Sequence, residues 1–98
     1  MLTKMLSSDK RPIGIFDSGV GGLSILKELR KQAPAENIVY FADSRYFPYG
    51  TRSVPEIRKR AFAVTHQLLK ADAKLIIVAC NTASAAALDD LRNVFDVP

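Results

Sequence analysis

The sequence has few of the features that mark secreted, metal-binding or membrane proteins. It contains one cysteine in 98 residues, so it cannot form an internal disulfide framework, and its cysteine and histidine lack metal-site spacing. No apolar run approaches the length of a membrane span, and residues 1–11 lack the apolar segment of a signal peptide. We therefore expect a cytoplasmic protein with no membrane partner, and we interpret residues 1–11 as a flexible tail.

A strong excess of charge of one sign is also missing. The formal net charge is +4, and 24% of the residues are charged against 48% that are hydrophobic. This composition is typical of a soluble globular domain, and the length permits one modest core. A basic cluster suggests a nucleic-acid surface, but such a cluster on a helix is more often a solvated face, so we predict no nucleic-acid partner. The cluster contains Arg52, Arg58, Lys59 and Arg60.

Apolar runs of strand length alternate with stretches of helical periodicity. Parallel strands joined by right-handed helical crossovers explain this order best. The sequence therefore predicts an α/β fold, with an open parallel sheet and flanking helices of the doubly wound type. The expected strands are 12–16, 37–42 and 75–79. The first expected helix ends before Pro34, the second begins at a capping box of Ser53 and Glu56, and the third spans 83–94.

Helical spacing also predicts which side chains face the sheet. In the first helix, one apolar face contains Leu23, Leu26 and Leu29. We expect the second helix to bury Ile57, Ala61, Val64 and Leu68, and the third to bury Ala87, Leu88, Leu91, Val94 and Phe95.

Chemically active side chains follow each of the three expected strands. Because parallel strands end at the same edge of a sheet, where open α/β sheets bind ligands, we expect these segments to converge. A carboxylate, hydroxyls, a phenol, an amide and a thiol could then surround one small polar molecule without a metal or cofactor. The three segments are Asp17-Ser18-Gly19, Asp43-Ser44 leading to Pro48-Tyr49-Gly50, and Cys80-Asn81-Thr82.

Cys80 lies where an apolar strand gives way to an alanine-rich helix. Asn81, Thr82 and Ser84 are helix-capping residue types, so unpaired amides and the helix dipole would face the sulfur. Both stabilise negative charge, which favours a reactive thiolate at this position. An inert, buried cysteine at a strand end is the alternative.

Each of the other segments also has a structural alternative. Asp17 and Ser18 could cap the first helix, and Pro48-Tyr49-Gly50 could be a plain turn. A dinucleotide motif that starts at Gly19 would require glycine where Ser24 stands, and the residues after Gly19 do not complete a phosphate-binding Walker loop. We therefore do not favour a nucleotide site.

Three ordered stretches of the sequence resemble the N-terminal part of bacterial glutamate racemase, in the aspartate/glutamate racemase family. The likeness covers about Pro12 to the end of the chain. The second stretch departs from the family's commonest pattern. It continues as Asp43-Ser44-Arg45-Tyr46-Phe47, where Asp-Thr and a smaller residue are more usual, and this difference affects the fine details of substrate contact. The matching stretches are Gly14–Leu23, Tyr40–Asp43 with Pro48–Gly50, and Val78–Ser84.

The resemblance implies a cofactor-independent enzyme that interconverts L- and D-glutamate by two-base proton transfer and supplies D-glutamate for peptidoglycan. Cys80 matches the first of the family's two catalytic cysteines, and Asp17 would assist the thiol or meet the substrate ammonium. By position, the substrate-contacting residues would be Asp17, Ser18, Tyr49, Gly50, Asn81 and Thr82.

The resemblance also implies that residues 12–98 are the N-terminal segment of the first domain of a two-domain racemase. The family's second cysteine belongs to a later domain, so we expect these residues alone to be inactive and the full-length enzyme to be a homo-oligomer. A related racemase acting on aspartate or a hydantoin remains an alternative, and so does a non-catalytic α/β binding module, which would not need a reactive Cys80.

Overall fold

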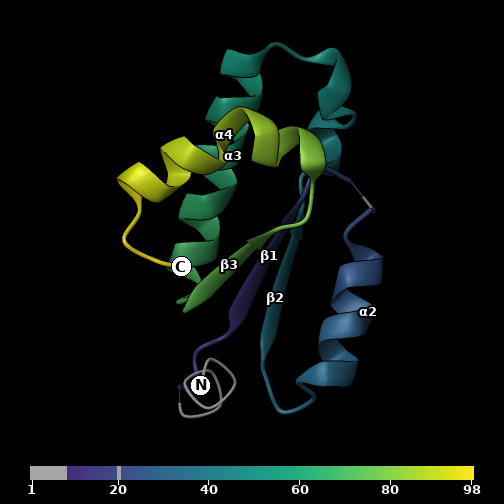
Figure 1. Cartoon of the computed structure of the whole chain (residues 1–98), viewed down its shortest axis with the longest axis vertical. Coiled ribbons are helices and arrows are strands. Elements are labelled where there is room, and N and C mark those ends of the chain that lie inside the picture. The colour runs from purple at the N-terminus through teal and green to yellow at the C-terminus, as the bar shows by residue number, and fades with distance from the viewer. Residues whose placement is uncertain (1–8, 20) are drawn as a thin grey trace.

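The computed structural model describes residues 9–19 and 21–98. Its centre is a three-stranded sheet in the order β2-β1-β3, and both strand pairs are parallel. Helices α3 and α4 lie together against the sheet, and α2 stands apart from them beside β2 (Figure 1). The strands are β1 (Ile13–Asp17), β2 (Ile38–Ala42) and β3 (Leu75–Val78), and the helices are α2 (Leu23–Gln32), α3 (Val54–Lys70) and α4 (Asn81–Val94).

This arrangement confirms the predicted open parallel sheet with flanking helices. The capping box before α3 is also present, because Ser53 Oγ accepts a hydrogen bond from the Glu56 backbone N–H at 3.3 Å. Two short 3₁₀ helices, η1 (Ser44–Tyr46) and η2 (Tyr49–Thr51), shape the long connection between β2 and α3. The Phe47–Pro48 peptide bond between them is cis.

The two faces of β1 contribute to different layers. Phe16 belongs to the core cluster under α3 and α4, whereas Ile13 and Ile15 point the other way and are also fully buried. Alternation of side chains along a strand explains this division. Gly14 is needed on the α3 side, because a Cβ there would lie 3.1 Å from the Ala73 Cβ and 3.3 Å from the Leu68 side chain.

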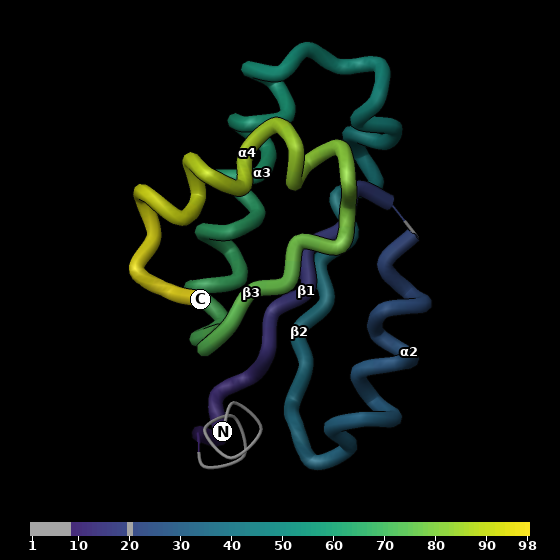
Figure 2. Tube along the Cα trace, in the orientation of Figure 1, coloured from purple at the N-terminus to yellow at the C-terminus, as the bar shows by residue number. Residues whose placement is uncertain are grey.

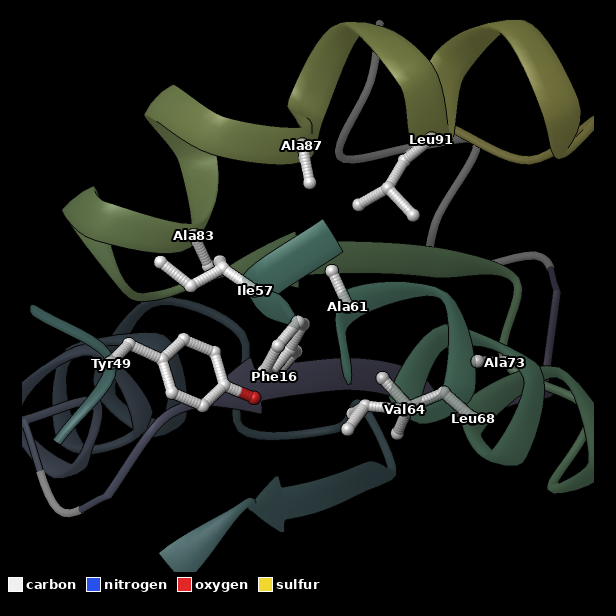
Figure 3. Close-up of a cluster of buried hydrophobic side chains, with 10 residues drawn as sticks. All are labelled: Phe16, Tyr49, Ile57, Ala61, Val64, Leu68, Ala73, Ala83, Ala87 and Leu91. Carbon is white, nitrogen blue, oxygen red and sulfur yellow. The ribbon is translucent and has the colours of Figure 1, made fainter. Parts of the chain in front are cut away.

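The main core lies between the sheet and the two packed helices (Figure 3). The predicted buried face of α3 is confirmed in full: Ile57, Ala61, Val64 and Leu68 are each at most 3% exposed. From α4, the buried residues are Ala83, Ala87 and Leu91.

Two expectations for the last helix were wrong. The helix begins at Asn81, not at residue 83, because Cys80 serves as its N-cap. Val94, expected in the core, is 61% exposed, since the helix ends there and its last turn extends past the sheet. Phe95 follows the helix as its C-cap and is half-buried, with its ring 5.6 Å from that of Phe62.

Within residues 9–19 and 21–98, no helix combines the length and apolar character needed to cross a membrane.

A matched pair of valines tests the core. We expect Val64→Ala to lower the free energy of unfolding by about 2 kcal/mol, because it removes two buried methylene equivalents and leaves a cavity. Val94→Ala makes the same chemical change at a side chain that is 61% exposed, and should alter stability by less than about 0.5 kcal/mol. Urea unfolding followed by circular dichroism measures both. Equal effects would contradict the assignment of Val64 to the core.

Candidate functional site

The carboxyl ends of the three strands are joined by hydrogen bonds that extend the sheet past its last paired residues. The Asp43 N–H donates to the Asp17 carbonyl at 2.8 Å, and the Ala79 N–H donates to the Phe16 carbonyl at 2.8 Å. Asp17, Asp43 and the residue before Cys80 are therefore held next to one another. Figure 2 follows the chain from β3 into α4 beside the ends of β1 and β2.

Cys80 is half-buried and occupies the N-cap position of α4. Its Sγ accepts a hydrogen bond from the Ala83 backbone N–H at 3.5 Å, and its carbonyl accepts from the Ser84 N–H at 2.9 Å. The sulfur therefore lies at the positive end of the helix dipole. Asn81 and Thr82 do not cap the helix as expected; they lie exposed in its first turn.

Asp17 is 2% exposed at the end of the central strand. Its Oδ2 accepts hydrogen bonds from the Gly22 N–H at 2.6 Å and from the Tyr40 hydroxyl at 2.8 Å. Burial, and then the bond to Asp17, raises the pKa of Tyr40 to about 12, so the phenol remains a donor at neutral pH. Asp17 thus has the turn-shaping contact that the sequence left open as an alternative, while Ser18 beside it is half-buried.

Gly22 fills a narrow space between the strand ends. A Cβ at this position would lie 3.0 Å from the Tyr40 hydroxyl oxygen, 3.1 Å from the Ala79 Cβ and 3.2 Å from the Asp17 Cβ. The glycine-rich turn therefore has a packing role at Gly22, which allows α2 to start close to the sheet. Sequence reasoning missed Tyr40. The available signal was alternation along the strand, because Tyr40 lies on the same face as Ala42, the residue that pairs with Asp17.

Of the two neighbouring residues Tyr49 and Gly50, the first is buried and the second is exposed. The Tyr49 ring is 1% exposed and makes an edge contact with Phe16 at a centroid distance of 6.1 Å, and its hydroxyl donates to Asp43 Oδ2 at 2.5 Å. Its phenol belongs to the core, so Tyr49 could meet a ligand through its backbone. Gly50 is exposed, and a Cβ there would touch nothing within 4 Å.

Asp43 is the centre of a buried ionic network that sequence reasoning did not find. It is 4% exposed and accepts two bonds from Arg60, from Nε to Oδ2 at 2.9 Å and from Nη2 to Oδ1 at 2.8 Å. Burial alone would raise the pKa of Asp43, but the bonds from Arg60 and Tyr49 hold it below its ordinary value. The available signal was the capping box, which fixes the register of α3 and hence the side of the helix on which Arg60 lies.

The predicted basic cluster is largely neutralised by carboxylates. Besides the Arg60 pair, Arg58 Nε lies 2.7 Å from Asp90 Oδ2, and Arg52 Nη1 lies 3.4 Å from Glu56 Oε2. Exposed pairs of this kind contribute little to stability. Three arginines of the cluster, Arg58 and Arg60 on α3 and Arg52 just before it, thus each face a carboxylate.

No group of three or more His, Cys, Asp or Glu side chains is arranged to hold a metal ion in the part of the chain that the structure describes.

Comparison with known proteins assigns the fold and these motifs to a family. A model of the Asp/Glu/hydantoin racemase family matches residues 13–98. The chain belongs to this family. Glutamate racemase from Clostridium acetobutylicum is 51% identical over 90 residues, which cover 92% of this chain and 35% of the relative. Glutamate racemase from Roseiflexus is 53% identical over 91 residues, which cover 93% and 34%.

Solved racemase structures share the same backbone arrangement. Glutamate racemase from Thermus thermophilus, solved with β-chloro-D-alanine, has a TM-score of 0.87 at 49% identity and covers 91% of this chain and 35% of its own. The Francisella tularensis enzyme, solved with D-glutamate, has a TM-score of 0.82 at 48% identity and covers 86% of this chain and 32% of its own. The chain thus spans about a third of the length of the racemases it matches.

The lowered pKa of Asp43 predicts a pH-dependent contribution to stability. The ionised carboxylate stabilises the fold above the ordinary pKa of aspartate, about 3.9, and this contribution is lost as the pH falls through the lower folded value. We expect Asp43→Asn to reduce the free energy of unfolding most near about pH 7, and progressively less below about pH 4.

Urea titrations at a series of pH values measure the difference between the parent chain and Asp43→Asn. Asp89→Asn, at an exposed position of α4, is the matched control and should cause little change. A difference between the parent chain and Asp43→Asn that stays constant from about pH 7 to about pH 3 would contradict an ionised, stabilising Asp43.

Proposed function

We propose that this chain is the N-terminal segment of the first domain of a glutamate racemase, in which Cys80 transfers a proton at the α-carbon of glutamate. The observation that carries the proposal is the position of the thiol. Cys80 lies at the N-terminus of α4, beside the joined ends of β1 and β2, in a chain about half identical to glutamate racemases. The glutamate racemases among its relatives favour glutamate over aspartate or a hydantoin as the substrate.

Racemisation requires a base on one face of the α-carbon and an acid on the other, each within hydrogen-bond reach. A thiolate at a helix N-terminus can accept a proton near neutral pH and return it. One thiol supplies one face, so the second catalytic group in our proposal lies outside these 98 residues. The proposed reaction is a two-base proton transfer that needs no cofactor.

The neighbouring residues have separate roles in this proposal. Asp17 keeps a carboxylate beside the site, where it can assist the thiol or meet the substrate ammonium. The polar groups of Asn81 and Thr82, exposed next to Cys80, would hold carboxylate oxygens of the substrate and stabilise the charge that develops after proton removal. Ser18, Gly50 and the backbone of Tyr49 complete the proposed contact set.

The proposed biological role is the supply of D-glutamate for peptidoglycan, within the cytoplasm. In the proposal, a second domain closes over the ends of the strands, the full-length enzyme is a homo-oligomer, and the protein has no nucleic-acid partner.

A chimera tests the proposal directly. Residues 12–98 would replace the matching segment of the Clostridium acetobutylicum glutamate racemase, to which this chain is 51% identical. We expect the chimera to interconvert L- and D-glutamate, and the 98-residue chain alone to be inactive, as measured by circular-dichroism progress curves in both directions. A folded chimera that racemises neither enantiomer would overturn the proposal.

Cys80→Ser in the chimera tests the assignment of the base. We expect racemisation to fall by at least about 100-fold, because a serine hydroxyl is far less acidic than a thiol and is rarely ionised. The resemblance to glutamate racemases implies that Cys80 takes the α-proton of D-glutamate, so exchange of that proton with solvent deuterium should suffer more than exchange from L-glutamate. Racemisation like that of the parent chimera would show that Cys80 is structural, and would favour a binding module.

Asp17→Asn in the chimera tests the carboxylate. The amide keeps the shape and an acceptor oxygen for Gly22 or Tyr40, so the fold should be retained, while loss of the charge should lower kcat by about tenfold. Kinetics and a thermal unfolding curve are measured together, with Asp89→Asn as the control. An unchanged kcat would leave Asp17 with only its turn-shaping role.

A further inference from the structure

We propose that Arg60 is a positioning residue for substrate binding, which acts through Asp43 and Tyr46 to fix the segment 44–52 at the edge of the site. This inference rests on the proposed function and assigns a role to Arg60, which none of the motifs included. Arg60 does not touch the proposed reaction centre. It holds in place the segment that presents Tyr49 and Gly50.

The first contact of this arrangement is with Asp43, where the segment begins. Both carboxylate oxygens of Asp43 face the guanidinium of Arg60, at 2.9 and 2.8 Å, in the paired geometry that arginine makes best. The backbone N–H of Asp43 donates to Asp17, so the same residue is fixed to the end of the central strand. Arg60 therefore connects α3 to the strand end from which the segment departs.

The second contact is with Tyr46, in the middle of the segment. The Arg60 guanidinium lies 3.9 Å from the centre of the Tyr46 ring, and that of Arg52 lies 5.3 Å from it. Arg52 Nε also donates to the Tyr46 carbonyl at 2.8 Å. Two cations on one ring hold its orientation through cation–π attraction.

The third contact, made by Tyr49, links the segment to the helix that Cys80 caps. Tyr49 donates to the same Asp43 oxygen that accepts from Arg60 Nε, and its ring packs on Phe16 in the core. The short helix η2, which begins at Tyr49, contacts α4, and Cys80 packs against the core cluster that contains Tyr49. The position of Gly50 relative to Cys80 thus depends on Asp43, which Arg60 neutralises.

Arg60→Lys is the test variant, and Arg58→Lys is its matched control on the same helix. Lysine keeps the charge but loses the two-pronged geometry and the flat stacking surface. Arg58 also pairs with a carboxylate, that of Asp90, but the side chains of Arg58 and Asp90 are about half exposed, at 48% and 43%. The control therefore replaces a paired arginine on the same helix that makes no contact with the segment in the network described above.

In the active chimera, we expect Arg60→Lys to raise KM for both enantiomers by about tenfold while kcat changes by less than about twofold, and Arg58→Lys to leave both constants unchanged. Equal kinetics in the two variants would overturn the proposal. A fall in kcat without a rise in KM would also overturn it, because that pattern assigns Arg60 to the chemical step.

Amide hydrogen exchange of the 98-residue chain separates this inference from the proposed function. We expect Arg60→Lys, and not Arg58→Lys, to accelerate exchange at Tyr46, Phe47 and Arg52, whose N–H groups are bonded within the segment. Unchanged exchange would overturn the positioning role, whether or not the chimera is a racemase. An inactive parent chimera with accelerated exchange in Arg60→Lys would overturn the proposed function and retain Arg60 as the residue that orders the segment.

Discussion

Burial of the central strand on both faces is the constraint on which the rest of the structure depends. Ile13, Ile15 and Phe16 are each 0% exposed, and β1 pairs with a parallel strand on either side. A strand in this position has no free edge, and because both neighbours run parallel to it, the carboxyl ends of the three strands lie at the same edge of the sheet. The convergence of Asp17, Asp43 and Cys80 follows from that pairing, because each residue comes within two positions of a strand end.

Prediction from sequence succeeded where one local signal decided the structure. Apolar runs marked the three strands, and the 3.6-residue spacing of α3 identified its buried face, since both signals arise from burial of one side of an element. It failed where the deciding group was not one of the usual sequence signals. The start of α4 was misjudged because Cys80 supplies the capping acceptor, and cysteine is not a residue type that signals a helix cap.

The candidate site was predictable in position and less so in detail. The order of the strands brought the three segments to one edge, but it could not show that the Tyr49 phenol turns inward. That orientation depends on Asp43, and the stability of a buried Asp43 depends in turn on Arg60, 17 residues later in the chain. A network whose members lie in a loop, a strand end and a helix has no spacing rule from which it could be recognised.

The two aspartates at this edge make more hydrogen bonds within the fold than the thiol does. Asp43 is committed to Arg60 and Tyr49, and Asp17 accepts from Gly22 and Tyr40, so both carboxylates have structural partners. Replacing either residue by alanine would leave buried donors without an acceptor, which costs more than the hydrogen bonds themselves contribute. The Cys80 sulfur, in contrast, accepts one long hydrogen bond, from the Ala83 N–H at 3.5 Å. Of these three side chains, the thiol that we propose as acid and base therefore has the fewest hydrogen bonds to lose.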